Sequence, residues 1–220
     1  MFPGDTAYSQ QWVARIGPGC PVNVSAITLS PHVGAHADAP LHYDPDGAAI
    51  GAVDLQTFIG PCRVVHAIGC GPLVRPQHIA HALDEPPPGR SQGGPAPTGS
   101  SDRRSGAAWG LKALPPRVLV RVYHRMPQDR FDNALPAFAP ETIALLADRG
   151  VVLVGIDSAS VDPAESKALE SHQVLRRRGL RVLENLLLDE VPEGDYELIA
   201  LPLKLTTADA SPVRAVLREI

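Results

Sequence analysis

The stretch SPHVGAHADAPLH, residues 30–42, places three of the chain's eight histidines and one aspartate within eleven positions. Gly34 and Pro40 interrupt this stretch and oppose a helix, so a turn must bring the side chains together. Imidazole and carboxylate groups are the ligands that zinc-type divalent ions take in proteins. The stretch therefore predicts a metal site, and most of the functional interpretation depends on it.

Three side chains of this stretch, His32, His36 and Asp38, are the candidate ligands. Asp38 lies two positions beyond His36, so it can bind the same ion or bridge to a second ion with its other oxygen. Three protein ligands leave coordination positions open, which is typical of a catalytic zinc site rather than a structural one. His42 follows the stiff Pro40 and approaches from another direction, which favours proton transfer over a role as a further ligand.

A second ion would need ligands from elsewhere in the chain, and the candidates are His172 and Glu184. Apolar sequence beside each of them allows both to point inward at a strand–helix junction. From the residues alone the simpler interpretation is preferred, namely a solvated helix histidine and a carboxylate in an ordinary salt bridge. Sequence spacing leaves the choice open.

The composition is that of a soluble globular chain. With 220 residues, 44% hydrophobic and 20% charged, it suits one domain, residues 1–220, with a sizeable core. The net charge of −4, without a Lys/Arg-rich run, argues against nucleic acid as a partner, and no apolar run is long enough for a bilayer. Residues 1–5 lack the pattern of a secretory signal, so we expect a cytoplasmic protein. The odd set Cys20, Cys62 and Cys70 predicts buried, reduced thiols.

Apolar patterning predicts strands interleaved with a few helices, which indicates an α/β fold. The strands are expected at 22–30, 62–68, 117–122, 151–156, 181–186 and 196–201, and the helices at 140–150 and 166–178. The first strand alternates apolar and small polar residues, as a half-buried strand does, and runs directly into the histidine stretch. The strand at 151–156 is apolar throughout, which is typical of a buried central strand.

The segment 85–110 does not share this patterning. It contains Pro86-Pro87-Pro88, Gly93-Gly94-Pro95 and a Ser/Gly/Arg run. Such a composition buries too little apolar surface to offset the loss of chain entropy. We therefore expect a disordered loop insertion at 85–110.

The histidine stretch resembles the signature His-x-Gly-Thr-His-x-Asp-x-Pro-x-His of the cyclase-like metal hydrolases, and within them it is most similar to the bacterial kynurenine formamidases, or arylformamidases. Shorter matches occur in the expected order along nearly the whole chain. They are Pro3-Gly4-Asp5-Thr6, Tyr43-Asp44, Gly155-Ile156-Asp157-Ser158, Asp162-Pro163, Ser166-Lys167, Glu184-Asn185-Leu186, Leu201-Pro202-Leu203-Lys204-Leu205 and Asp209-Ala210-Ser211-Pro212-Val213-Arg214.

This resemblance implies a swivelling β/β/α domain with a mixed sheet and few helices. It also implies a homodimer in which residues of the partner lie close to the active site. It implies two Zn²⁺ ions per subunit that share Asp38 as a bridge. One ion would be bound by His32, His36 and Asp38, the other by Asp38, His172 and Glu184, and His42 would be the general acid/base.

Two departures from the family pattern bear on the site. Ala35 stands where the signature has Thr, at a position that is not a ligand. Phe2 stands where these proteins carry a Trp that packs on the aromatic ring of the substrate, so Phe2 is the candidate substrate-binding residue. A phenyl ring can still stack, and we expect altered binding rather than loss of the site.

The activity that the resemblance implies is hydrolysis of N-formyl-L-kynurenine to L-kynurenine and formate by a zinc-activated water, a step of tryptophan degradation in the kynurenine pathway. The Gly-x-Ser-x-Gly match at residues 89–93 lies in the aperiodic segment 85–110 rather than between a predicted strand and a predicted helix, so it does not indicate a serine nucleophile. One alternative is a related metal hydrolase that acts on another amide or on a lactam such as an isatin-type ring. The other is a zinc-binding module without catalysis.

Overall fold

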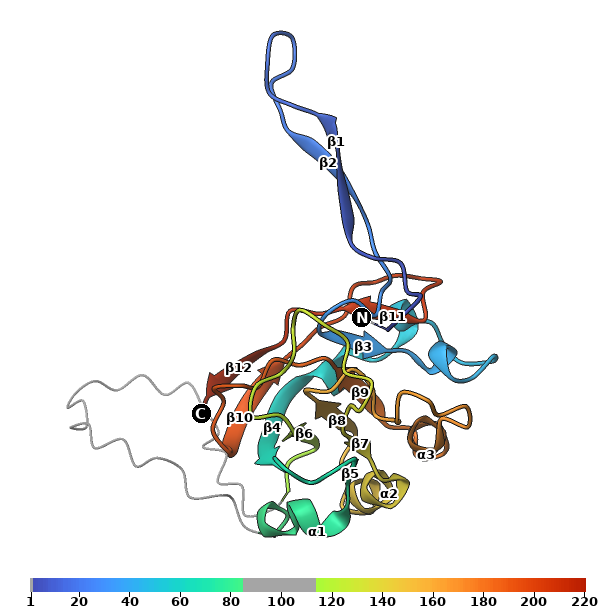
Figure 1. Cartoon of the computed structure of the whole chain (residues 1–220), viewed down its shortest axis with the longest axis vertical. Helices are drawn as coiled ribbons and strands as arrows, with labels where there is room; N and C mark the ends of the chain where they lie inside the picture. Colours follow the sequence, from blue (N-terminus) through green and yellow to red (C-terminus); the bar gives the residue numbers. More distant parts are fainter. Residues whose placement is uncertain (1, 85–113) are drawn as a thin grey trace, which may run out of the picture.

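The computed structural model describes residues 2–84 and 114–220, so the insertion predicted at 85–110 lies outside the described residues. Within these ranges most strands belong to one curled, mixed sheet of eight strands (Figure 1). The order across this sheet is β11-β3-β9-β8-β6-β4-β10-β12. The strands β9, β8, β6 and β4 run parallel in the middle, and every other pairing in the sheet is antiparallel. The mixed α/β sheet expected from the sequence is confirmed.

The strands of this sheet have the following bounds: β3 His36–Asp38, β4 Ile59–His66, β6 Arg117–Arg121, β8 Leu153–Ile156, β9 Arg181–Glu184, β10 Gly194–Ile199, β11 Ala210–Pro212 and β12 Val216–Glu219. A small parallel pair consists of β5 (Leu73–Val74) and β7 (Ala137–Phe138). The central strand β8 is buried along its whole length, as its apolar sequence predicts. Neighbouring strands cover its edges, and apolar side chains on both faces of the sheet shield it from water.

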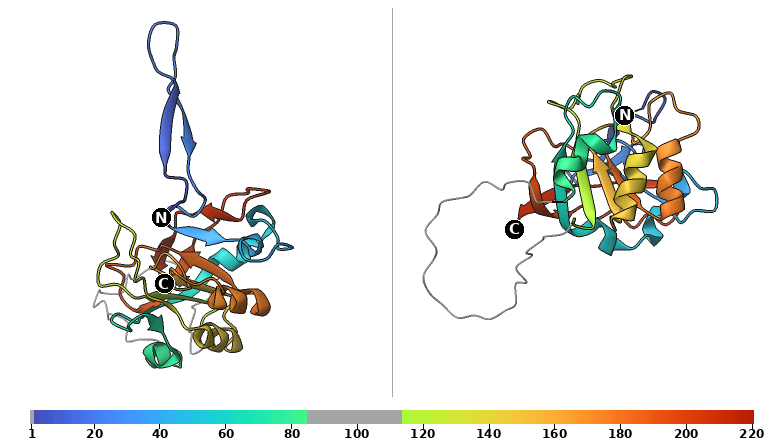
Figure 2. Two further views of the ribbon diagram at one scale, coloured as in Figure 1. Left: turned by 45° about the vertical axis from the view of Figure 1, so that its right-hand side comes forward. Right: turned by 90° about the horizontal axis from the view of Figure 1, so that it is seen from below.

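Three α-helices lie side by side on one face of the sheet (Figure 2). They are α1 (Pro76–Ile79), α2 (Pro140–Asp148) and α3 (Glu170–Arg178). Short 3₁₀ turns cover Pro40–His42 (η1), Ile50–Ala52 (η2), Leu55–Phe58 (η3) and Ala80–Ala82 (η4). One apolar cluster fills the space between the sheet and the helices, and a second lies on the other face of the sheet. None of the helices in the described ranges is long and apolar enough to cross a bilayer.

The predicted helix ends are correct for α2 and wrong for the start of α3. Helix α2 begins at Pro140 with Glu141 in its first turn, as the sequence indicates. Helix α3 begins at Glu170 rather than near 166, because Leu169 has a left-handed conformation with φ of 48° that stops a helix from extending backwards. This late start leaves the segment before α3 free to curve toward the metal-site residues.

The strand predicted at 22–30 is shorter than expected and is not half-buried. It is β2 (Val24–Thr28), which is exposed along its whole length. It pairs with β1 (Ser9–Ala14) in a hairpin that projects away from the sheet (Figure 1). The alternation of the sequence therefore reflects a two-stranded ribbon that no other part of the described chain covers.

The prediction of buried cysteines holds for one residue of three. Cys62 is buried in β4, whereas Cys20 and Cys70 are partly exposed, and all three are free thiols. Cys20 lies near the tip of the projecting hairpin, where nothing in the described chain buries it.

A buried ion pair joins β10 to β4, next to the edge strand β12 of the sheet. Arg63 and Asp195 are directly opposite each other in the β4–β10 register. Arg63 is 1% exposed, and its Nε and Nη2 donate to the two carboxylate oxygens of Asp195 at 2.7 and 2.9 Å. Its Nη1 donates to the carbonyl oxygen of Ala82 at 2.9 Å. This guanidinium therefore ties two strands to the 3₁₀ turn η4.

We expect Asp195→Ala to lower the free energy of unfolding by about 3–5 kcal/mol, because it removes the carboxylate that makes two hydrogen bonds with the buried guanidinium of Arg63. The matched control is Glu141→Ala, which removes the carboxylate of an exposed pair with Arg75 and should cost about 1 kcal/mol or less. Urea denaturation of both variants measures the difference. Equal midpoints for the two variants would contradict the importance of the buried pair.

Candidate metal centre

The short strand β3 carries two of the predicted ligands in the middle of the fold. Successive side chains of a strand alternate between faces, so His36 and Asp38 point to the same side. Strand β9 pairs with β3 so that Glu184 stands directly opposite His36. The prediction of a turn is therefore wrong in part. Residues 31–35 form a turn, whereas His36 and Asp38 lie on a strand.

The remaining predicted residues come from three other places. His32 lies in the turn before β3, and His42 ends the 3₁₀ turn η1 after it. His172 lies in the first turn of α3 and is 2% exposed, so it is not a solvated helix histidine. The carboxylate of Asp38 is fully buried. The structure brings all of these side chains to one place.

The two oxygens of Asp38 face different histidines. Its Oδ1 lies 3.2 Å from Nδ1 of His32 and 3.4 Å from Nε2 of His36. Its Oδ2 lies 3.4 Å from Nε2 of His172. Glu184 completes the cluster, with Oε2 at 3.4 Å from Nε2 of His36 and Oε1 at 3.6 Å from Nε2 of His172.

The other ring nitrogen of each of these histidines contacts a group that only accepts hydrogen bonds. Nδ1 of His36 lies 2.9 Å from the carbonyl oxygen of Gly34, and Nδ1 of His172 lies 2.7 Å from Oδ2 of Asp162. Nε2 of His32 lies 3.0 Å from Oδ2 of Asp209. Each of these nitrogens must therefore be the N–H donor. In a neutral imidazole the opposite nitrogen then carries a lone pair, and it points at the carboxylates of Asp38 and Glu184.

A nitrogen lone pair and a carboxylate oxygen that face each other repel unless a positive charge lies between them. Nε2 of His36 and Oδ1 of Asp38 are buried and have no hydrogen-bond partner in the part of the chain that the structure describes. Burial disfavours the charged imidazole of His36, yet the facing carboxylates of Asp38 and Glu184 raise its pKa to about 10. Burial opposes the charge of His172 in the same way, but the carboxylates of Asp162 and Asp38 raise its pKa to about 10. The cluster thus favours cations strongly.

The donor set fits a divalent metal ion. Nitrogen and carboxylate ligands converge, and an outer partner fixes the proton of each imidazole on the nitrogen that faces away, as at metal sites in general. Two groups of three donors have their ligand atoms within 4.8 Å of one another: His32, Asp38 and His42, and His36, Asp38 and Glu184. His42 is therefore close enough to the other donors to act as a ligand or as an acid/base.

Two carboxylates of the site carried no role in the sequence interpretation. Asp162 accepts backbone N–H groups of Ser171 at 2.8 Å and of His172 at 3.0 Å, so it caps α3 and orients His172 at once. Asp209 contacts both His32 and His42. The signal that could have found them is an aspartate at the start of a predicted helix in the first case. In the second case the signal is the segment 209–214, which begins with Asp209 and matches the family pattern.

A cavity of about 280 Å³ opens in front of the metal-site residues. Phe2 lines it together with His32, His36 and His42, and on the far side it is bounded by Ser160, Pro163 and Leu169. The ring of Phe2 packs against that of Phe131, with centroids 4.8 Å apart. An aromatic wall therefore stands beside the cluster, and of its two rings the sequence predicted a role only for Phe2.

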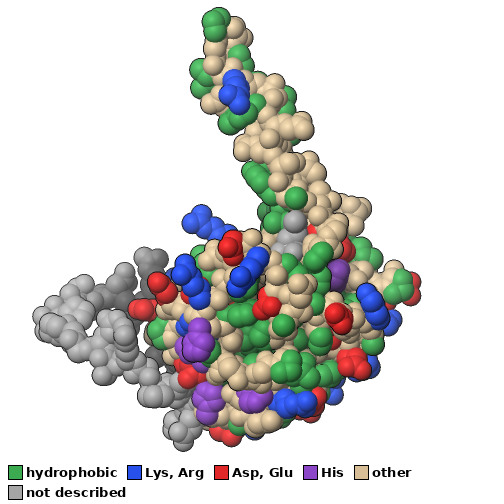
Figure 3. Space-filling model, in the orientation of Figure 1, with side chains coloured by type: hydrophobic (Ala, Val, Ile, Leu, Met, Phe, Trp, Pro, Cys, Tyr) green, Lys and Arg blue, Asp and Glu red, His purple; other side chains and the backbone are tan. Residues whose placement is uncertain are grey.

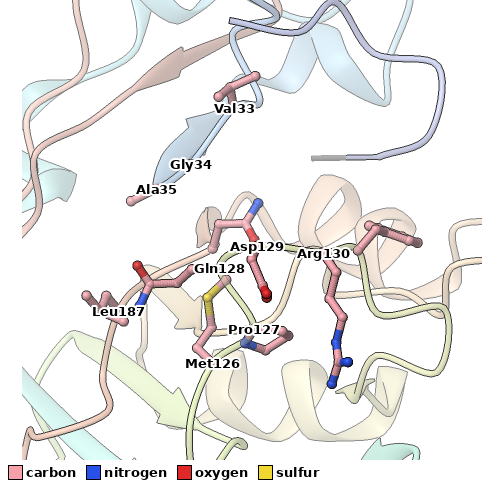
Figure 4. Close-up of a pocket in the computed structure, with 11 residues that line it drawn as sticks. Val33, Gly34, Ala35, Met126, Pro127, Gln128, Asp129, Arg130 and Leu187 are labelled. Carbon is pink, nitrogen blue, oxygen red and sulfur yellow. The ribbon is translucent and has the colours of Figure 1, made fainter.

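A second cavity, of about 530 Å³, lies next to the first. Val33, Gly34 and Ala35 form one side, and the segment from Met126 to Arg130 forms the other (Figure 4). Phe131 and Asn185 line both this cavity and a small hollow that also touches Ala159, a residue of the first cavity. The space beside the metal centre is thus open toward the loop that carries Phe131.

Comparison with known proteins agrees with this geometry. The Cyclase family model matches residues 3–94. A solved structure titled as a potential metal-dependent hydrolase with cyclase activity is 26% identical with a TM-score of 0.69, over 97% of this chain and 100% of that one. Isatin hydrolase A from Labrenzia aggregata shares the fold at 20% identity and a TM-score of 0.71, over 98% of this chain and 84% of that one.

A full-length relative is far more similar. The kynurenine formamidase of Paracidovorax citrulli is 70% identical over 218 residues, which is 99% of this chain and 90% of that protein. Such identity over nearly the whole of both chains shows that the two proteins belong to one family. The chain belongs to the kynurenine formamidase family.

Proposed function

We propose that this protein is an arylformamidase that hydrolyses N-formyl-L-kynurenine to L-kynurenine and formate, a step of tryptophan degradation in the kynurenine pathway. The observation that carries the proposal is the cluster of His36, Asp38, His172 and Glu184, whose lone pairs converge on one buried place beside an aromatic-lined cavity. The name of the relative at 70% identity supports the same substrate. The three free cysteines support a reducing compartment such as the cytoplasm.

We further propose two Zn²⁺ ions per subunit with Asp38 as their bridge. The two oxygens of Asp38 support this, because one faces His32 and His36 while the other faces His172. Metal ions held there would supply a Lewis acid and lower the pKa of water to near neutral. Asp162 and Gly34 keep the second nitrogens of His172 and His36 protonated, so the first nitrogens remain available as ligands.

The chain's own groups then account for the rest of the reaction. The aromatic wall of Phe2 and Phe131 suits the ring of the substrate and leaves the formyl group toward the cluster. Water adds to the formyl carbon, and the bond between that carbon and the amide nitrogen attached to the aromatic ring breaks. This nitrogen then takes up a proton. His42 supports the proton transfer, because 31% of its side chain is exposed at the cavity and no carboxylate pairs with its Nε2 among the described residues.

We expect His42→Ala to lower kcat about 10²–10⁴-fold while the zinc content stays at two ions per subunit, because a general acid/base is lost and no ligand is. His172→Ala and Glu184→Ala should instead lose zinc. Metal analysis and turnover are measured on the same preparations. His81→Ala is the control, because His81 is an exposed histidine paired with Glu193 outside the cavity. Loss of zinc from His42→Ala would identify His42 as a ligand.

The substrate is tested by steady-state kinetics with N-formyl-L-kynurenine and with isatin. We expect turnover of the formamide to exceed that of the lactam by at least about two orders of magnitude in kcat/KM, because the exocyclic formyl group can reach the cluster while the aromatic ring packs on Phe2 and Phe131. Turnover of isatin alone would overturn the proposal in favour of a lactam hydrolase. Zinc binding without turnover of either compound would favour a binding module.

We also propose that the protein is a homodimer. The hairpin of β1 and β2 supports this, because its strands pair only with each other in the described ranges and its apolar side chains face water (Figure 3). Those that are about half-exposed or more are Tyr8, Trp12, Val13, Ile16, Val22, Val24 and Ile27. A second copy of the chain is the partner that would cover such a surface in every molecule.

The double variant Trp12→Glu with Ile27→Glu should dissociate the dimer, because two charges would lie in the apolar contact. Sedimentation equilibrium measures the mass. Val152→Glu is the control, since Val152 is 41% exposed on the body of the molecule outside the hairpin. A wild-type monomer, or a dimer that survives both hairpin charges, would contradict this role of the hairpin.

A further inference from the structure

Asp209 precedes β11 and is joined to the histidine stretch by both its backbone and its side chain. Its carbonyl oxygen accepts the N–H of Ala39 at 2.8 Å, immediately before the turn that carries His42. Next to it, Ala210 pairs with Asp38 in the β11–β3 register. The backbone on which Asp209 stands is thus fixed to the strand of the buried ligands and to the start of η1.

One oxygen of the Asp209 side chain contacts two imidazoles. Its Oδ2 lies 3.0 Å from Nε2 of His32 and 3.2 Å from Nδ1 of His42, whose rings lie 4.3 Å apart. A carboxylate only accepts hydrogen bonds, so both nitrogens must donate. Among the described residues, Asp209 is the only hydrogen-bond partner of the His42 side chain.

We propose that Asp209 is a positioning residue that holds the proton of neutral His42 on Nδ1 and keeps its Nε2 available for proton transfer. The inference rests on the proposed function, since it assigns the orientation of the acid/base of that reaction. A neutral imidazole has one N–H, and a partly exposed ring exchanges freely between its two tautomers and rotates about its side chain. A fixed carboxylate at Nδ1 selects one tautomer and one ring orientation, as in other carboxylate–histidine pairs.

The geometry also separates this role from that of Asp162. Asp162 is 2% exposed and binds the buried His172, whose Nε2 faces carboxylates. Asp209 has a side chain that is 42% exposed and binds His42, which lines the cavity. The two aspartate–histidine contacts are similar in chemistry but differ in role, because His42 is partly exposed at the cavity whereas His172 is buried.

The first experiment is a double-mutant cycle on the zinc-loaded enzyme with wild type, Asp209→Asn, His42→Ala and the double variant. We expect Asp209→Asn to lower kcat at least about 10-fold, with KM and zinc content unchanged. The reason is that the amide of Asn can donate as well as accept a hydrogen bond, so it no longer holds the proton of His42 on Nδ1. In the His42→Ala background the same substitution should change kcat less than about 2-fold. An equal loss in both backgrounds, or a loss of zinc, would overturn the proposal and assign Asp209 to His32 or to the fold.

The second experiment reads the tautomer without turnover. In ¹⁵N–¹H correlation spectra that link ring nitrogens to ring protons, His42 of the zinc-loaded wild type should have its proton on Nδ1. Asp209→Asn should shift it toward the Nε2–H form. Glu193→Gln is the matched control, because Glu193 makes the same kind of contact to His81 at 2.9 Å. An unchanged His42 tautomer in Asp209→Asn would overturn the proposal, whereas failure of the wild type to hydrolyse formylkynurenine would count against the proposed function alone.

Discussion

The buried carboxylate of Asp38 is the group on which the rest of the site depends. It has no exposure to water, and histidine nitrogens surround both of its oxygens. A buried anion is stable only where partners compensate its charge, so the surrounding elements must bring positive or proton-donating groups within reach. Strand β3, which carries Asp38, is held between β9 and β11, and those two strands bring Glu184 and Asp209 to the same place.

The hydrogen bonds on the outer side of each histidine determine which ring nitrogen faces the centre of the cluster. Gly34, Asp162 and Asp209 each accept a hydrogen bond from one ring nitrogen and so turn the other toward the centre. The candidate ligands are then preorganised, because their protons and orientations are fixed without any ion or substrate. His42 shares this arrangement but lines the cavity, so chemically identical side chains are placed for the two proposed roles of metal binding and proton transfer.

The sequence predicted the parts of this protein that depend on local chemistry. The histidine stretch predicted its own residues as candidate ligands. Apolar patterning located β8 and α2, together with β2, β4, β6, β9 and β10, within a few residues, but it did not predict the short or edge strands β1, β3, β5, β7, β11 and β12. It was wrong where tertiary context decides the outcome. Strand β2 alternates like a half-buried strand but projects into solvent, and α3 begins late because Leu169 is left-handed. Periodicity reports which side chains could share a face, and it does not report whether another layer covers that face.

The amino-acid sequence by itself determined which residue types are available and that four of them lie together at 32–42. Only the tertiary structure decided which side chains meet them. His172 lies 134 positions from Asp38, and Asp209 lies 177 positions from His32, so no spacing rule along the chain relates them. The register of β3 with β9 and β11 and the start of α3 bring them together. These are long-range backbone pairings, and the tautomers and charges of the site follow from them rather than from any local pattern.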